Sequence, residues 1–390
     1  MNELLILGRI LTRIGEKMGK KVICAGHVCL DITPVIPDLG AKKIEDVLQP
    51  GKLLNVGEAD ISLGGSVSNT GIGMKVLGND VSLMGKIGCD AFGEIVESLY
   101  GKYGVAEGLL RNDSVSTSYS VALAIPGIDR IFLHHPGAND TFTADDIPWE
   151  RVKDAALFHF GYPPLMKSMY ENEGEELVRL FKKAKESGAS TSLDLAAVDP
   201  GSSSGKADWK KILSKVLPFV DFFVPSVEEL CFMLDRDRFH DWKKRAEGKD
   251  VCEIINLEED IRPLADKCME MGCKVLMIKC GAPGMYLRTA GKERLDSIGS
   301  RIEFRTSVWE KQDFFEKSYL PDRILSGTGA GDTSIAAFLT AVLNGENPEW
   351  AMHYAAATGA SCITELDAIS GLKTLPELKK KIESGWEKRE

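Results

Sequence analysis

The strongest constraint on the fold of this chain is a regular alternation of short apolar runs with longer amphipathic segments. Each apolar run is typical of a buried parallel strand, and each longer segment has apolar residues at helical spacing. Strands are expected at 21–26, 155–160, 190–195, 221–224 and 274–279, and helices at 171–188, 210–218 and 262–272. This alternation predicts an α/β fold whose mostly parallel sheet is covered by helices on both faces.

A loop of small residues near the C-terminal end precedes an apolar segment with helical spacing. The loop reads Ser-Gly-Thr-Gly-Ala-Gly-Asp over 326–332, and the predicted helix continues to residue 343. Free backbone N–H groups at a helix start carry partial positive charge and bind anions. A carboxylate there, Asp332, is unfavourable unless it does chemistry, such as accepting a proton from an attacking hydroxyl. A glycine-rich turn with Asp332 as helix cap is the alternative for the loop alone.

Composition and charge exclude several classes of protein. The chain has 390 residues with a net charge of −10, and it has no long basic block, so nucleic acid is not an expected partner. Its nine cysteines are scattered without zinc-type spacing, which predicts a reducing cytoplasm and no structural metal. No run approaches the length of a membrane span. Residues 1–17 resemble a weak amphipathic targeting helix but lack a small-residue cleavage site, so they are interpreted as an extra N-terminal turn or a start-site artefact.

Polar and glycine residues follow the first predicted strand and open the first predicted helix. Asp31 comes just beyond the strand, where open α/β sheets bind ligands, although it could equally form a turn before Pro34. Gly64 and Gly65 would let a ligand approach the backbone. A helix is expected from Asn69 to residue 77.

Two segments outside this alternation predict a small separate sheet. Residues 54–63 alternate between polar and apolar, and residues 118–125 and 130–134 read as a hairpin about a Pro-Gly turn. We expect these strands to project from the body as a lid, and their exposed edge favours a homodimer. His134 and His135 are interpreted as strand-end residues. The polar insertions 235–260 and 307–322 are expected to be surface excursions or oligomer contacts.

Two signatures resemble those of the PfkB carbohydrate kinase family, which has a ribokinase-like fold. The first runs from Gly64 to Asn69 and on through Gly85–Gly93, and the second is Gly-Ala-Gly-Asp at 329–332. The similarity extends from about residue 21 to about residue 372. It implies a three-layer αβα kinase domain at 21–372 with lid segments near 34–63 and 116–135. Residues 1–20 would be an N-terminal extension, and residues 373–390 a C-terminal helix.

The resemblance implies phosphorylation of a hydroxyl on a sugar or sugar-like small molecule, with ATP and Mg²⁺. Asp332 matches the family's general base, and the amides of Gly329, Ala330 and Gly331 match its anion hole. Glu229 matches the residue that helps organise magnesium, indirectly through water. The substrate-binding positions are Asp31, Gly64, Gly65, Asn69 and Asp332. The nucleotide-binding positions are Ser226, Lys279, Gly281, Gly284, Thr328, Gly329, Gly331, Ala356, Gly359 and Ala360.

Three positions depart from the family pattern. Ser226 stands where Asn is usual, and Asp367 stands where Gly is common. Ser326-Gly327 replaces an Asp-Thr pair whose Asp often helps to bind a monovalent cation, which puts activation by such a cation in question. Two alternatives to a sugar kinase follow: a nucleoside kinase of the same fold, and a non-catalytic homologue that binds sugar or nucleotide. A dinucleotide dehydrogenase is disfavoured, because no Gly-x-Gly-x-x-Gly follows the first strand.

Overall fold

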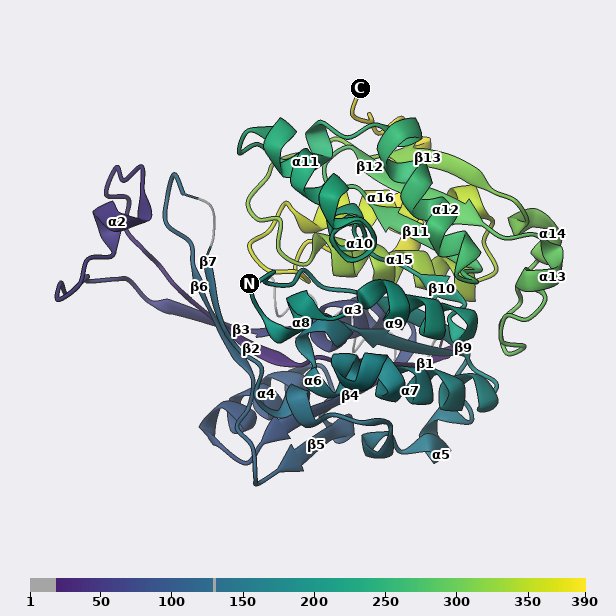
Figure 1. Cartoon of the computed structure of the whole chain (residues 1–390), viewed down its shortest axis with the longest axis horizontal. Helices are drawn as coiled ribbons and strands as arrows, with labels where there is room; N and C mark the ends of the chain where they lie inside the picture. The colour runs from purple at the N-terminus through teal and green to yellow at the C-terminus, as the bar shows by residue number, and fades with distance from the viewer. Residues whose placement is uncertain (1–18, 129–130) are drawn as a thin grey trace.

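The body of the protein is built on one large, mostly parallel sheet (Figure 1). The computed structural model describes residues 19–128 and 131–390. The sheet has nine strands in the order β13-β12-β11-β10-β9-β8-β1-β4-β5. Only the β11–β12 and β12–β13 pairs are antiparallel. The strands are β1 (Lys21–Gly26), β4 (Asp80–Gly88), β5 (Leu109–Asn112), β8 (Leu157–Gly161), β9 (Ser190–Asp194), β10 (Phe222–Phe223), β11 (Val275–Lys279), β12 (Gly284–Thr289) and β13 (Asp313–Lys317).

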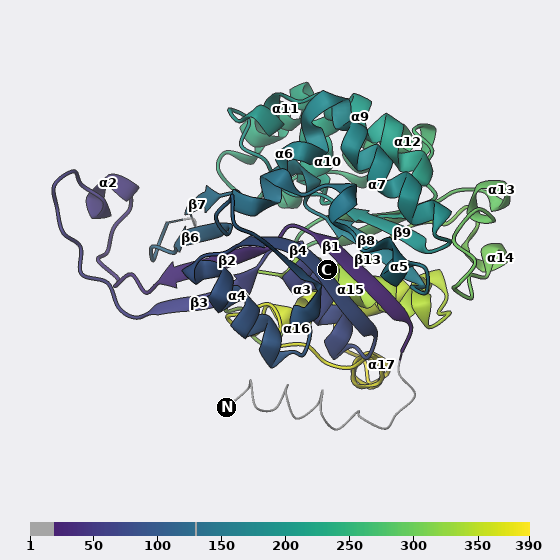
Figure 2. The same ribbon diagram turned by 90° about the horizontal axis from the view of Figure 1, so that it is seen from below.

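Helices cover both faces of this sheet and enclose two apolar cores (Figure 2). One face carries α3 (Ser66–Val76), α4 (Ala91–Lys102), α15 (Ala330–Leu343), α16 (Pro348–Cys362) and α17 (Leu375–Glu383). The other carries α7 (Glu175–Glu186), α9 (Trp209–Val216), α10 (Val227–Leu234), α11 (Arg236–Ala246) and α12 (Arg262–Glu270). Shorter helices are α2 (Ile44–Val47), α5 (Trp149–Val152), α6 (Lys167–Tyr170), α8 (Ser203–Lys206), α13 (Lys292–Leu295) and α14 (Thr306–Trp309). The predicted α/β layers are confirmed.

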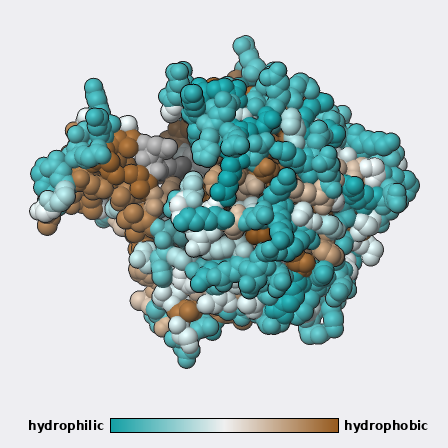
Figure 3. All heavy atoms as spheres, in the orientation of Figure 1, coloured by the Kyte–Doolittle hydropathy of each residue, from teal (hydrophilic) through white to brown (hydrophobic). Residues whose placement is uncertain are grey.

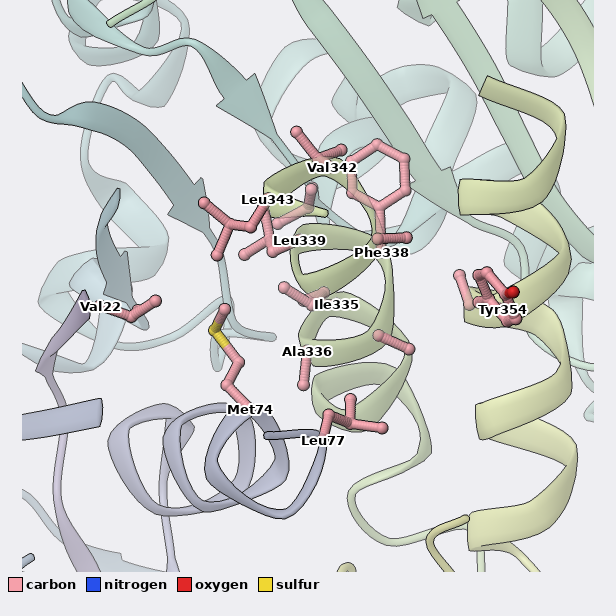
Figure 4. Close-up of a cluster of buried hydrophobic side chains, with 14 of the residues drawn as sticks. Val22, Met74, Leu77, Ile335, Ala336, Phe338, Leu339, Val342, Leu343 and Tyr354 are labelled. Carbon is pink, nitrogen blue, oxygen red and sulfur yellow. The ribbon is translucent and has the colours of Figure 1, made fainter. Parts of the chain in front are cut away.

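Helix α15 is buried from Asp332 to Leu343, which fixes the loop in front of it. Ile335 and Ala336 face Met74 of α3 and Leu77, which caps that helix, and Phe338 lies on the side of α15 nearer α16 (Figure 4). Each large apolar side chain buried in this way contributes about 1.5–3 kcal/mol. Because α15 is clamped between two helices and the sheet, its first turn is held rigidly at one edge of the body.

Four further strands form a separate sheet that projects from the body (Figures 1 and 2). We call it the lid sheet. Its order is β3-β2-β6-β7, from β2 (Cys29–Pro34), β3 (Ala59–Gly64), β6 (Tyr119–Leu123) and β7 (Ile131–His135). The β6–β7 hairpin is antiparallel as predicted, and β2 pairs in parallel with β6. Apolar side chains gather on the exposed surface of this part of the chain (Figure 3), including Phe132 and Leu133 of β7 and Leu53 in the connection that precedes β3.

Several predicted elements are wrong in type or in bounds. Asp31 lies inside strand β2 of the lid sheet, not in a turn, because its segment finds a partner in the distant hairpin. Strand β3 begins at Ala59 rather than at residue 54, and α3 begins at Ser66 rather than at Asn69. The polar insertion at 235–260 contains helix α11, which buries the ring of Trp242. The insertion at 307–322 supplies the edge strand β13.

The N-terminal extension predicted at 1–20 lies outside the described residues except for 19 and 20. Within the described ranges, no helix is long and apolar enough to cross a membrane.

Candidate active site

The glycine-rich loop ends at Asp332, in the first turn of α15. Gly329 caps the helix with φ 74°, a left-handed conformation that suits glycine. A Cβ on Gly329 would lie 2.1 Å from the Cβ of Ala368, so only glycine fits there. The Asp332 side chain turns inward, and the residue is only 5% exposed.

Two side chains from distant parts of the chain donate hydrogen bonds to the Asp332 carboxylate. Asn69 Nδ2, from α3, lies 2.9 Å from Oδ2. The Tyr162 hydroxyl, just after β8, lies 2.8 Å from Oδ1 and 2.9 Å from Oδ2. Burial raises the pKa of Asp332 above its ordinary value, although the charge of Lys279 and these two hydrogen bonds oppose the shift. A buried carboxylate with a raised pKa is a better proton acceptor than an exposed one.

The amides before Asp332 differ in their hydrogen bonding. The Ala330 N–H donates to the Gly327 carbonyl across 3.4 Å, a long and therefore weak bond. Within the described ranges, the N–H groups of Gly329 and Gly331 have no protein acceptor. In the part of the chain that the structure describes, two amides of the predicted hole therefore lack an acceptor, and the third donates only a weak hydrogen bond.

A buried ion pair stands beside this helix start. Lys279, at the end of β11, places its Nζ 2.7 Å from Asp194 Oδ1, at the end of β9. A Cβ on Gly331 would lie 3.8 Å from the same Nζ, so the ammonium group adjoins the glycine loop. Burial lowers the pKa of Lys279, but the charge of Asp194 and the other nearby carboxylates outweighs burial, and the pKa is raised overall. Lys279 therefore carries its charge at neutral pH.

Glu229 and Ser226 form a capping box at the start of α10. The Ser226 N–H donates to Glu229 Oε2 across 2.8 Å, and Ser226 Oγ accepts from the Glu229 N–H across 3.3 Å. Serine therefore caps the helix where the resemblance leads us to expect asparagine. Asp194 Oδ2 is buried without a hydrogen-bond partner in the described part of the chain. Unpartnered carboxylate oxygens beside a phosphate-type site fit Mg²⁺, which prefers oxygen ligands.

The lid sheet brings a second carboxylate toward Asp332. Asp31 lies against Gly64, where a Cβ would come within 2.2 Å of its Oδ2. Burial raises the pKa of Asp31, and the like charge of Asp332 raises it further. Gly65, with φ 85°, lies against His27, whose two ring nitrogens are buried without hydrogen-bond partners among the described residues. Glycine at 64 and 65 thus lets two polar side chains approach the start of α3.

A family model for pfkB family carbohydrate kinases matches residues 20–375. The chain belongs to this family. A sugar kinase of Archaeoglobus fulgidus is 24% identical over 305 residues, which cover 77% of this chain and 98% of that protein. The 5-dehydro-2-deoxygluconokinase of Clostridium perfringens is 22% identical over 370 residues, 93% of each chain. Arabidopsis thaliana ribokinase, solved with ribose and ATP, superposes with a TM-score of 0.67 at 19% identity over 93% of this chain and 98% of its own.

These findings confirm the predicted family and fold, and this pfkB family protein is a carbohydrate kinase. The remaining predicted nucleotide positions lie in the β11–β12 turn, on α16 and in the loop before α15. Gly281 and Gly284 form the β11–β12 turn with positive φ. Ala356 and Ala360 of α16 are core residues, 2% and 6% exposed, so a contact with adenine stays a prediction for them. Gly359 packs on Ser334 of α15, and the Thr328 N–H donates to Ser326 Oγ.

Sequence analysis missed three side chains of the site. They are Tyr162, His27 and Asp194. All three lie at or just beyond the carboxyl ends of the parallel strands β8, β1 and β9. In α/β sheets ligands bind at that edge. Reading every strand end for polar side chains would have found them.

The buried histidine at the base of the lid sheet should make stability depend on pH. Burial and the neighbouring His134 ring lower the pKa of His27 to about 3. In the unfolded chain His27 therefore binds a proton as pH falls through about 6.5, whereas in the folded protein it stays neutral. The free energy of unfolding consequently falls as pH falls below about 6.5. At pH 5 the loss from this residue is about 2 kcal/mol relative to pH 7.5.

Urea unfolding at both pH values checks this prediction. His27→Gln should shrink the stability difference between pH 7.5 and pH 5 by about 2 kcal/mol, because the variant lacks the titrating ring. His240→Gln, at an exposed position on α11, is the matched control and should leave the difference unchanged. Equal pH dependence in wild type and His27→Gln would show that the folded protein protonates His27 normally.

Proposed function

We propose that this pfkB family kinase transfers the γ-phosphoryl group of ATP to a hydroxyl of a sugar, with Asp332 as general base. One observation carries the proposal. A buried carboxylate follows directly on a helix start whose Gly329 and Gly331 amides have no acceptor among the described residues. A proton acceptor and an anion-binding group side by side are what phosphoryl transfer to a hydroxyl needs.

The chain's own residues would divide the work as follows. Asp332 would take the proton of the sugar hydroxyl as its oxygen attacks phosphorus. The amides of Gly329 and Gly331, joined by Ala330 if its long bond to Gly327 breaks, would donate to the phosphoryl oxygens. Lys279 would place a fixed positive charge on the same side. Because these donors are already in position, little reorganisation is needed during transfer.

Magnesium and ATP fit the residues on the nucleotide side. Asp194, through its unpartnered oxygen, and Glu229 would hold the metal, with Glu229 acting through water. When bound, Mg²⁺ neutralises charge on the nucleotide phosphates. Ser326-Gly327 offers no carboxylate at the position associated with a monovalent cation, so we propose that activity does not depend on one.

The acceptor sugar would lie between the lid sheet and α3. Asp31 and Asn69 would bond its hydroxyls, and glycine at 64 and 65 would let Asp31 and His27 lie close to the start of α3 beside it. Closure of the lid sheet over the sugar would exclude water from the base. We also propose a homodimer through the lid sheet, supported by exposed apolar side chains at Leu53, Phe132 and Leu133.

A substrate panel tests the proposal. The probes are D-ribose, D-fructose, 2-keto-3-deoxygluconate, adenosine and guanosine, each with Mg²⁺ and a non-hydrolysable ATP analogue. A true acceptor present at about 100 times its Kd should stabilise the fold by about 2.7 kcal/mol, seen as a rise in Tm. The same compound with ATP should release ADP.

The outcomes separate the candidate functions. A sugar that raises Tm and drives ADP release supports the proposal. A nucleoside that does both, with no sugar active, replaces it with nucleoside kinase activity. Ligands that raise Tm without any ADP release indicate a non-catalytic homologue.

A further inference from the structure

The backbone holds Tyr162 in an unusual conformation beside the base. Tyr162 directly follows β8 and precedes Pro163 and Pro164, with φ 66° and ψ 38°. A left-handed conformation is uncommon for a bulky residue, and it persists only where the surroundings enforce it. Strain of this kind is concentrated at functional sites, and here it aims the phenol at Asp332.

The Tyr162 hydroxyl occupies the place that an acceptor hydroxyl must take. A hydroxyl that gives its proton to a general base has to come within about 2.6–3.2 Å of a carboxylate oxygen. Tyr162 Oη lies 2.8 Å and 2.9 Å from the two oxygens of Asp332. Burial and the charge of Asp332 raise the pKa of Tyr162 well above its ordinary value, so the phenol keeps its proton and donates it. The carboxylate is therefore covered by a hydroxyl that belongs to the protein.

We propose that the Tyr162 hydroxyl keeps water off Asp332 until the sugar hydroxyl displaces it, so that Tyr162 determines specificity for sugar over water. The inference rests on the proposed role of Asp332 as base. Without the phenol hydroxyl, a water molecule would donate a hydrogen bond to the Asp332 oxygen that Tyr162 had occupied. That water would lose a proton to Asp332, its oxygen would bond to the γ-phosphorus, and the bond from phosphorus to the bridging oxygen would break, leaving ADP and phosphate.

A neighbour of Tyr162 offers the displaced hydroxyl an alternative hydrogen-bond acceptor. The His27 ring lies 6.0 Å from the Tyr162 ring, and its two nitrogens are buried without partners in the described chain. The His134 ring, on β7 of the lid sheet, lies 5.3 Å from the His27 ring. A neutral imidazole has one nitrogen that accepts a hydrogen bond. Rotation of the phenol toward His27 would exchange Asp332 for His27 as acceptor when a sugar enters under the lid sheet.

The test measures ATP hydrolysis with Mg²⁺-ATP alone and no sugar present. Tyr162→Phe should raise the rate of phosphate release at least tenfold over wild type. The double variant Tyr162→Phe with Asp332→Asn should return to the wild-type rate or below, because the gained activity needs the base. Tyr286→Phe removes a hydroxyl that donates to Asp313 across 2.8 Å, and it should change nothing.

A second readout follows the protonation of the base. The Tyr162 hydrogen bond lowers the pKa of Asp332, so the acid limb of the pH profile for ATP hydrolysis by Tyr162→Phe should lie at higher pH than the acid limb for hydrolysis by wild type. Asn tolerates the left-handed backbone, so Tyr162→Asn alone should also hydrolyse ATP faster than wild type even if Tyr162→Phe folds poorly.

Failure of this inference differs from failure of the proposed function. Unchanged hydrolysis in both Tyr162 variants, with sugar phosphorylation by wild type still lost in Asp332→Asn, overturns the role of Tyr162 alone. A gain in hydrolysis that survives Asp332→Asn also overturns it. Sugar phosphorylation that survives Asp332→Asn overturns the base on which both proposals depend.

Discussion

Replacing Asp332 with Asn is expected to lower kcat for sugar phosphorylation by about two to four powers of ten. The amide cannot accept the proton of the attacking hydroxyl, although its oxygen can still accept hydrogen bonds from Asn69 and Tyr162. Folding should be preserved, because burial opposes ionisation of the native carboxyl. The KM for ATP should change little, since the Gly329 and Gly331 amides remain. Steady-state kinetics with the best sugar of the panel gives both constants.

The matched control for this variant is Asp322→Asn. Asp322 pairs with Lys381 at the surface, and its side chain is 71% exposed. The change should leave kcat within about twofold, since exposed pairs contribute little. An Asp332→Asn enzyme that kept more than a tenth of wild-type turnover would exclude Asp332 as the base.

The Lys279→Met variant is expected to lose about 3–5 kcal/mol of unfolding free energy, the cost of leaving a buried charge without its partner. Asp194 is fully buried, its Oδ1 is bonded to Lys279, and its Oδ2 has no partner in the described chain. Burial raises the pKa of Asp194 to about 8 even beside Lys279, so without the ammonium group the carboxyl would have to take up a proton or remain an unpaired buried charge. Nucleotide affinity should fall as well, because the same charge adjoins Gly331. Urea unfolding and a thermal-shift titration with the ATP analogue measure the two effects.

A second substitution shows whether the loss comes from the stranded charge. Adding Asp194→Asn to Lys279→Met should recover part of the stability, since it removes the uncompensated carboxylate. Lys292→Met, which breaks an exposed pair with Asp296, should cost less than about 1 kcal/mol. If Lys279→Met also cost less than about 1 kcal/mol, Asp194 would be neutral in the folded protein and the pair would be an ordinary hydrogen bond.

Local sequence patterns were sufficient to predict those elements whose residues show a clear pattern without reference to a distant partner. The strands β1, β8, β9 and β11 were predicted because a buried parallel strand is apolar throughout its length. The β6–β7 hairpin was predicted because its turn residues join two adjacent runs. The helix start at α15 was predicted for the same reason, since its glycines and its apolar run are contiguous.

Elements that depend on distant partners were not predictable in this way. Strand β2 is defined by pairing with β6, about ninety residues later, and its own segment looks like a loop ending at Pro34. Helix α11 is rich in charge, and a single buried ring, Trp242, gives little periodic signal. The contact of Tyr162 with Asp332 spans 170 positions and rests on one left-handed residue. No local sequence pattern predicts a contact between residues so far apart in the chain.

The connection between the body and the lid sheet has a mechanical consequence. Only His27 and Val28 separate β1 from β2, and β3 runs into α3 through Gly65 alone. These two short connections would therefore act as a hinge about which the lid sheet rotates. Strand β2 has six residues, so a rotation of about 10° at the hinge would carry its far end about 3 Å but Asp31 only about 1.5 Å. The same rotation thus moves the far end of the lid sheet about twice as far as it moves Asp31, where the sugar would bind.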